Sequence, residues 1–265
     1  MNTTTDMFVQ NGQLPIAVRE YGGSGQPVIL LHGAGGDMSA WDSVGPTLAA
    51  GLRPVAIDLR GHGTSGDGPW SWDAALSDLE AVADELDLRR PAVAGHSLGG
   101  SLAARWAHRH PECPAVVSLD GHRAPVTSQD NYDPEAAGLT TQELDHLVTR
   151  LNAMFDAQAA TSNRPRADMM EALRASVQSD SLPVFAELTV PVLLVLATRS
   201  MPGLPAELEP LMVAFRAGLR RDVEALAASH SHLHVREIDG THGLLFEMPT
   251  EVAEMISTFV ARATA

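Results

Sequence analysis

The clearest candidate for chemistry is a serine in a tight glycine-flanked turn, Gly95-x-Ser97-x-Gly99. A short apolar run precedes it, as a buried strand would, and an apolar helical stripe follows it up to the next proline. A serine on so sharp a strand-to-helix turn adopts strained backbone angles, which small flanking residues tolerate. The turn holds the hydroxyl at a sheet edge, beside the backbone N–H of Leu98. The pattern predicts a nucleophile elbow with Ser97 as the nucleophile.

A serine hydroxyl is a poor nucleophile until a neighbouring base takes its proton, and His242 is the candidate base. It lies in a loop after the predicted strand 232–238, with Gly243 beside it to allow close approach. The rival histidines lie in or before that strand, or inside turn motifs: His230, His232, His234, His62, His96 and His122.

Two other loops follow predicted buried strands. The glycine-rich loop 32–37 lacks the Lys-Ser/Thr pair and the G-x-G-x-x-G spacing of nucleotide sites, but it offers a backbone N–H at Ala34. The charged cluster 58–65 is tempting as a site. We interpret it as a hydrogen-bonded turn, with glycines where the backbone needs a positive φ.

The rest of the chain supplies elements that could position these groups. Asn11-Gly12 between two apolar runs predicts a hairpin, and buried strands alternate with amphipathic helices. This alternation predicts a parallel α/β sheet with its site at the carboxyl ends of the strands. Residues 123–187 break the alternation, and Thr140-x-x-Glu143 is a capping box that opens a helix there. We therefore expect a core of residues 1–122 and 188–265 and a helical cap, or lid, of residues 123–187.

Composition excludes several classes of partner. The net charge is −15 and no residue is a lysine, which argues against nucleic acid and anionic membranes. The single cysteine, Cys113, fits a reducing compartment. The first residues lack the features of a signal peptide, and no apolar run reaches the length of a membrane span. We expect a cytoplasmic protein; the sequence does not indicate an oligomeric state.

Four motifs in order resemble those of the α/β-hydrolase superfamily over nearly the whole chain. They are His32-Gly33-Ala34-Gly35-Gly36, Asp58-x-Arg60-Gly61-His62-Gly63, Gly95-His96-Ser97-Leu98-Gly99-Gly100 and Gly240-Thr241-His242. The resemblance implies the α/β-hydrolase fold: a mostly parallel central sheet flanked by helices, with a cap after the sixth strand. It also implies a catalytic order of serine, acid and histidine.

The acid departs from the commonest pattern of that superfamily. Most members carry it after the seventh strand, where this chain has Ser200 and, beside it, Arg199. A smaller group takes it from the end of the sixth strand, where Asp120 is followed by a glycine. The resemblance therefore implies that Asp120 orients His242 and stabilises its charged form.

The implied activity is that of a serine hydrolase of the esterase or lactonase type, acting through an acyl-serine intermediate. The backbone N–H groups of Ala34 and Leu98 would form the oxyanion hole, and neither a metal nor an organic cofactor is expected. The apolar cap favours a small-molecule substrate with a hydrophobic part, which Met154 and Phe155 could contact. The resemblance also admits a thioesterase, a carbon–carbon bond hydrolase, a perhydrolase or a non-catalytic binder. Serine at the elbow argues against dehalogenase and epoxide hydrolase chemistry, which uses an aspartate there.

Overall fold

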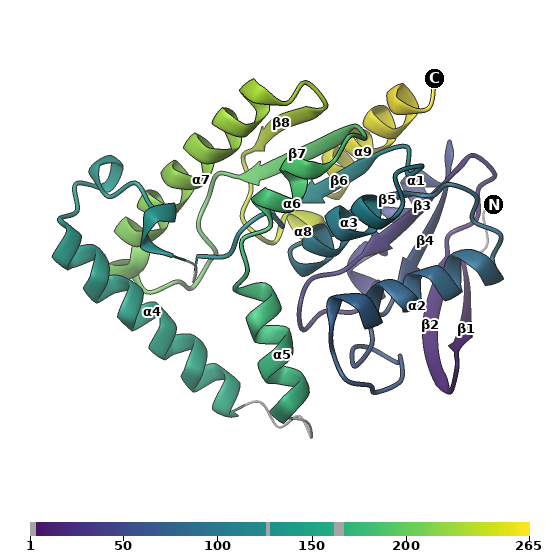
Figure 1. Cartoon of the computed structure of the whole chain (residues 1–265), viewed down its shortest axis with the longest axis horizontal. Helices are drawn as coiled ribbons and strands as arrows, with labels where there is room; N and C mark the ends of the chain where they lie inside the picture. Colours follow the sequence, from purple (N-terminus) through teal and green to yellow (C-terminus); the bar gives the residue numbers. More distant parts are fainter. Residues whose placement is uncertain (1–3, 126–127, 162–166) are drawn as a thin grey trace.

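The computed structural model describes residues 4–125, 128–161 and 167–265. Its described strands form one sheet of eight in the order β1-β2-β4-β3-β5-β6-β7-β8 (Figure 1). β2 runs antiparallel to both of its neighbours, β1 and β4, whereas the pairs among β3 to β8 are all parallel. The strands are β1 (Thr5–Asn11), β2 (Leu14–Glu20), β3 (Gln26–Leu31), β4 (Leu52–Ile57), β5 (Ala92–His96), β6 (Val116–Leu119), β7 (Val192–Ala197) and β8 (Leu233–Ile238).

Helices connect the strands and cover the sheet (Figure 1). The described α-helices are α1 (Gly45–Leu48), α2 (Trp72–Glu85), α3 (Leu98–Arg109), α4 (Thr141–Thr161), α5 (Ala167–Val177), α6 (Leu182–Glu187), α7 (Glu209–Ser229), α8 (Leu244–Glu247) and α9 (Pro249–Ala263). Short 3-10 helices are η1 (Met38–Trp41), η2 (Gln129–Asn131), η3 (Glu135–Ala137) and η4 (Ala206–Leu208).

The central strands are buried on both faces, which explains their continuous apolar sequence. In β3, for example, Ile29 and Leu31 belong to the hydrophobic core that contains residues of α2, α3 and α7. Val28 and Leu30 belong to the opposite core, with residues of α1 and α9. Because side chains alternate along a strand, one short apolar segment supports both layers.

The local predictions are confirmed where the structure tests them. β1 and β2 form the hairpin, and Gly12 has a φ of 62°. The predicted capping box begins α4, with the backbone N–H of Thr140 donating to Glu143 at 2.8 Å and that of Glu143 to the Thr140 hydroxyl at 3.3 Å. The two hydrogen bonds of the capping box satisfy backbone N–H groups at the start of α4 that have no acceptor within the helix.

The helices α4, α5 and α6 all lie between β6 and β7, and Figure 1 shows α4 and α5 away from the sheet. Leu144, Val148 and Leu151 of α4 nevertheless belong to the same hydrophobic core as the sheet. Trp70, in the loop before α2, also donates its indole N–H to the Ser176 hydroxyl of α5 at 3.0 Å. Among the described residues, no helix is long and apolar enough to cross a lipid bilayer.

Candidate active site

Ser97 lies on a strained turn between β5 and α3. Its φ of 53° and ψ of −121° fall outside the regions that side-chain-bearing residues prefer. The turn is possible because the surrounding backbone is very close. A Cβ on Gly95 would lie 2.0 Å from the Gly99 carbonyl oxygen, and a Cβ on Gly99 would lie 2.3 Å from that of Leu31. The Gly-x-Ser-x-Gly spacing is therefore a packing requirement.

Asp120 and His242 meet at the same edge of the sheet, although 122 positions separate them in the chain. His242 Nδ1 donates to Asp120 Oδ2 at 2.6 Å, and the backbone N–H of Ala197 donates to Asp120 Oδ1 at 3.2 Å. Asp120 follows β6, Ala197 ends β7 and His242 follows β8. Three neighbouring strands thus fix the carboxylate and the imidazole against each other.

The hydrogen bond and the opposite charges stabilise the charged forms of both His242 and Asp120. Burial alone would lower the pKa of His242, but the hydrogen bond with Asp120 and the charge of its carboxylate raise it above the ordinary 6.5. Burial acts to raise the pKa of Asp120, and the hydrogen bond and charge of His242 outweigh it, so this pKa lies below 3.8. The imidazole therefore takes up a proton more readily than a free histidine does.

Two backbone N–H groups near Ser97 are free to bind a ligand oxygen. Leu98 is the first residue of α3, where the N–H has no partner within the helix. Ala34 lies in the exposed loop after β3. Among the described residues, neither N–H donates a hydrogen bond to a protein acceptor.

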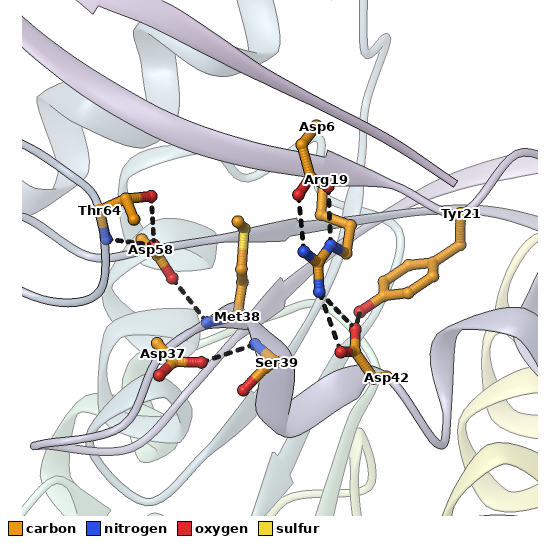
Figure 2. Close-up of polar contacts among 9 residues, drawn as sticks. All are labelled: Asp6, Arg19, Tyr21, Asp37, Met38, Ser39, Asp42, Asp58 and Thr64. Atoms are coloured by element: carbon orange, nitrogen blue, oxygen red, sulfur yellow. Dashed lines mark hydrogen bonds and ion pairs between the residues drawn. The ribbon is translucent and has the colours of Figure 1, made fainter. Parts of the chain in front are cut away.

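The loop that carries Ala34 is held by the turn 58–65. Figure 2 shows the Asp58 carboxylate between two partners: it accepts from the backbone N–H of Met38 at 2.6 Å and from that of Thr64 at 2.8 Å. His32 accepts from the N–H of Leu59 at 3.0 Å and is fully buried. These contacts support the interpretation of the charged cluster as a structural turn.

A second polar network lies nearby and braces the start of the sheet. Figure 2 shows Arg19 between Asp6 and Asp42, and the hydroxyl of Tyr21 donates to Asp42 at 2.7 Å. Asp42 directly follows η1, so this network ties the chain after the Ala34 loop to β1 and β2.

Several sequence-based interpretations need correction or stay open. Arg123, three residues after Asp120, is buried: its side chain is 4% exposed and pairs with Asp180 at 2.7 Å and Asp222 at 2.6 Å. Ser200 accepts a hydrogen bond from Arg216 of α7. Met154 is 44% exposed, and its contact with a substrate stays a prediction.

The side chain of Phe155 lies outside the described part of the chain, so its predicted role is untested. The described residues contain no group of three or more His, Cys, Asp or Glu side chains placed to hold a metal ion.

One histidine that the sequence reasoning set aside contacts the candidate base directly. His96 Nε2 donates to the carbonyl oxygen of His242 at 2.7 Å, and the two ring centroids are 4.7 Å apart. The position of His96 beside Ser97 was the sequence feature that could have pointed to a role in the site. Its partner, His242, lies 146 residues away in the chain, so the contact itself was not visible.

The comparisons with known proteins agree with this architecture. The profile of the "Alpha/beta hydrolase family" matches residues 28–255, so the chain belongs to the α/β-hydrolase family. One relative is the dihydrolipoyllysine-residue acetyltransferase component of an acetoin cleaving system from Pseudomonas putida. It is 40% identical over 105 residues, which cover 38% of this chain and 28% of that protein. A non-heme chloroperoxidase of Kitasatospora aureofaciens is 39% identical over 92 residues, 33% of each chain. These matches span about a third or less of the relatives' lengths.

The fold as a whole is shared with solved structures of low sequence identity. An esterase from Exiguobacterium antarcticum superposes with a TM-score of 0.69 at 17% identity, covering 97% of this chain and 100% of that one. At this identity the likeness establishes the fold alone.

Proposed function

We propose that this protein is a serine hydrolase that cleaves a carboxylic ester or lactone with Ser97, His242 and Asp120. The observation that carries the proposal is the 2.6 Å hydrogen bond from His242 to Asp120, at the sheet edge where the strained Ser97 turn lies. A carboxylate at Nδ1 fixes the imidazole tautomer that leaves Nε2 free to accept a proton. The aspartate proposed for this part, Asp120, follows β6.

Acylation would begin when Ser97 Oγ attacks the carbonyl carbon of the substrate while His242 Nε2 takes the hydroxyl proton. The negative charge that develops on the carbonyl oxygen would be bound by the N–H groups of Ala34 and Leu98. One such donor is worth roughly 3–4 kcal/mol of barrier. Collapse of the tetrahedral intermediate expels the alkoxide, which takes the proton from His242; in a lactone it stays attached to the acyl chain.

Deacylation would repeat these steps with water as the nucleophile. Water attacks the acyl carbon, His242 takes its proton, and collapse returns that proton to Ser97 Oγ and releases the carboxylic acid. These steps consume one water and need no metal or organic cofactor, in line with the expected absence of both.

The partner we propose is a small-molecule ester with a hydrophobic part, bound under a cap formed by residues 123–187. The apolar residues of α4 that join the main core hold this helix against the sheet. The net charge of −15 supports a protein that binds neither nucleic acid nor anionic membranes. The free, buried Cys113 fits the proposed cytoplasmic location.

An activity-based probe tests the proposal. A fluorophosphonate should label the wild-type protein at Ser97, Ser97→Ala should abolish labelling, and His242→Ala should abolish turnover. A panel of p-nitrophenyl esters of graded chain length, with lactones and thioesters, would then identify the substrate class. A wild-type protein that is not labelled would instead be a non-catalytic binder.

The similarity to a chloroperoxidase favours one second candidate, a perhydrolase on the same residues. Hydrogen peroxide would replace water as the acyl acceptor, so that the acyl-serine yields a peracid. Peracid formed from a short carboxylic acid and hydrogen peroxide, at a rate above ester hydrolysis, would favour this function. Ser97→Ala is the control for both reactions.

A further inference from the structure

His96 lies between the two loops that flank Ser97. On one side its Nε2 donates to the carbonyl oxygen of His242 at 2.7 Å, and the rings of the two histidines are 4.7 Å apart. On the other side it faces the loop after β3: a Cβ on Gly33 would lie 3.2 Å from His96 Nδ1 and 3.0 Å from the Ser97 Cβ. A single ring thus separates the loop that carries Ala34 from the loop that carries His242.

The chemistry of these contacts specifies the state of the ring. A carbonyl oxygen can only accept, so Nε2 of His96 must carry the hydrogen. Burial, together with the nearby His242, lowers the pKa of His96 to about 4, so the ring is neutral near pH 7 and Nδ1 is without a proton. The titratable groups that act on it come from three loops: His242, Asp120 and His32.

We infer that His96 is a positioning residue that sets the place of His242 relative to Ser97 and to the oxyanion-binding loop. The inference rests on the proposed function, because it gives His242 the role of base. His96 touches neither substrate nor a transferred proton; it acts by holding the backbone of the base. A misplacement of about 1 Å at such a site can cost about a hundredfold in rate.

Two amide variants separate positioning from bulk packing. The amide nitrogen of His96→Gln can reach the place of Nε2 and donate to His242, whereas that of His96→Asn corresponds to Nδ1 and is too short. We expect Gln to keep kcat within about threefold of wild type. We expect Asn to lose about ten- to a hundredfold in kcat with little change in KM, because ground-state binding is untouched. His234→Asn makes the same chemical change on the exposed side of β8 and should be silent.

Three readouts decide the matter: ester kinetics, the rate of fluorophosphonate labelling and the downfield proton resonance between His242 Nδ1 and Asp120. The resonance should persist in His96→Gln and broaden or vanish in His96→Asn. Equal behaviour of the two variants, whether both active or both impaired in step with their melting temperatures, would overturn the inference. A wild-type protein that the probe does not label would refute the proposed function. The proton resonance of the variants would still show whether His96 positions His242.

Discussion

Substituting asparagine for Asp120 is the perturbation that tests the site most directly. Asparagine tolerates the positive φ of 49° at this position, so the backbone should not change. The backbone N–H of Ala197 needs an acceptor, which directs the amide oxygen toward it. The amide nitrogen then faces His242 Nδ1 in place of the carboxylate oxygen. Since this nitrogen donates, Nδ1 must become the acceptor and Nε2 must carry the proton.

A protonated Nε2 cannot take the hydroxyl proton of Ser97. In serine proteases the same tautomer change costs about 10⁴ in turnover, or about 5.4 kcal/mol of barrier. The positive charge on His242 also loses its counter-ion. We therefore expect Asp120→Asn to lower kcat at least a hundredfold, which is about 2.7 kcal/mol.

The assay is steady-state hydrolysis of a p-nitrophenyl ester, with circular dichroism and the melting temperature to verify folding. Asp239→Asn is the matched control, because it removes the same charge from an 85% exposed side chain in the loop that directly follows β8. It should leave kcat within about twofold of wild type, since exposed ion pairs contribute little. A folded Asp120→Asn protein with the wild-type rate would refute the role of this carboxylate.

Three further predictions follow from the same geometry. His242 must be neutral to accept a proton and its pKa lies above 6.5, so kcat/KM should fall as the pH decreases, with a midpoint above 6.5 in a pH–rate profile; a midpoint below 6.5 would contradict the pairing with an ionised acid. Ser200→Ala should leave kcat unchanged in the ester assay, because the Ser200 hydroxyl binds Arg216; a loss as large as that of Ser97→Ala would reassign the site. Asp58→Ala orphans two backbone donors and should cost about 2–4 kcal/mol of unfolding free energy in a urea titration, whereas an unchanged midpoint would show that water replaces the carboxylate.

Features encoded by neighbouring residues were predictable from the sequence. The hairpin, the elbow and the capping box each depend on residues a few positions apart, because glycine, serine and threonine act on their own backbone. The buried strands were equally visible, since a strand covered on both faces is continuously apolar.

Features that join distant segments were not predictable in the same way. Arg123 pairs with Asp180 and Asp222, which lie 57 and 99 residues further along the chain. Nothing near Arg123 in the sequence distinguishes a buried arginine from an exposed one. His96 has the same property: its identity is local information, but its contact with His242 exists only once β5 and the loop after β8 are brought to one edge.

The geometry of β6, β7 and β8 explains how Asp120, at the end of the sixth strand, reaches His242. These strands are parallel and adjacent, and Leu119 is paired with Val195, so the residues that follow them reach the same edge. After β7 the chain keeps pairing with the β8 side: Thr198 donates to the carbonyl of Ile238, and Arg199 to that of Gly240. This pairing leads the chain after β7 toward β8. It leaves the Ala197 N–H facing Asp120, whose carboxylate reaches across the end of β7 to the imidazole.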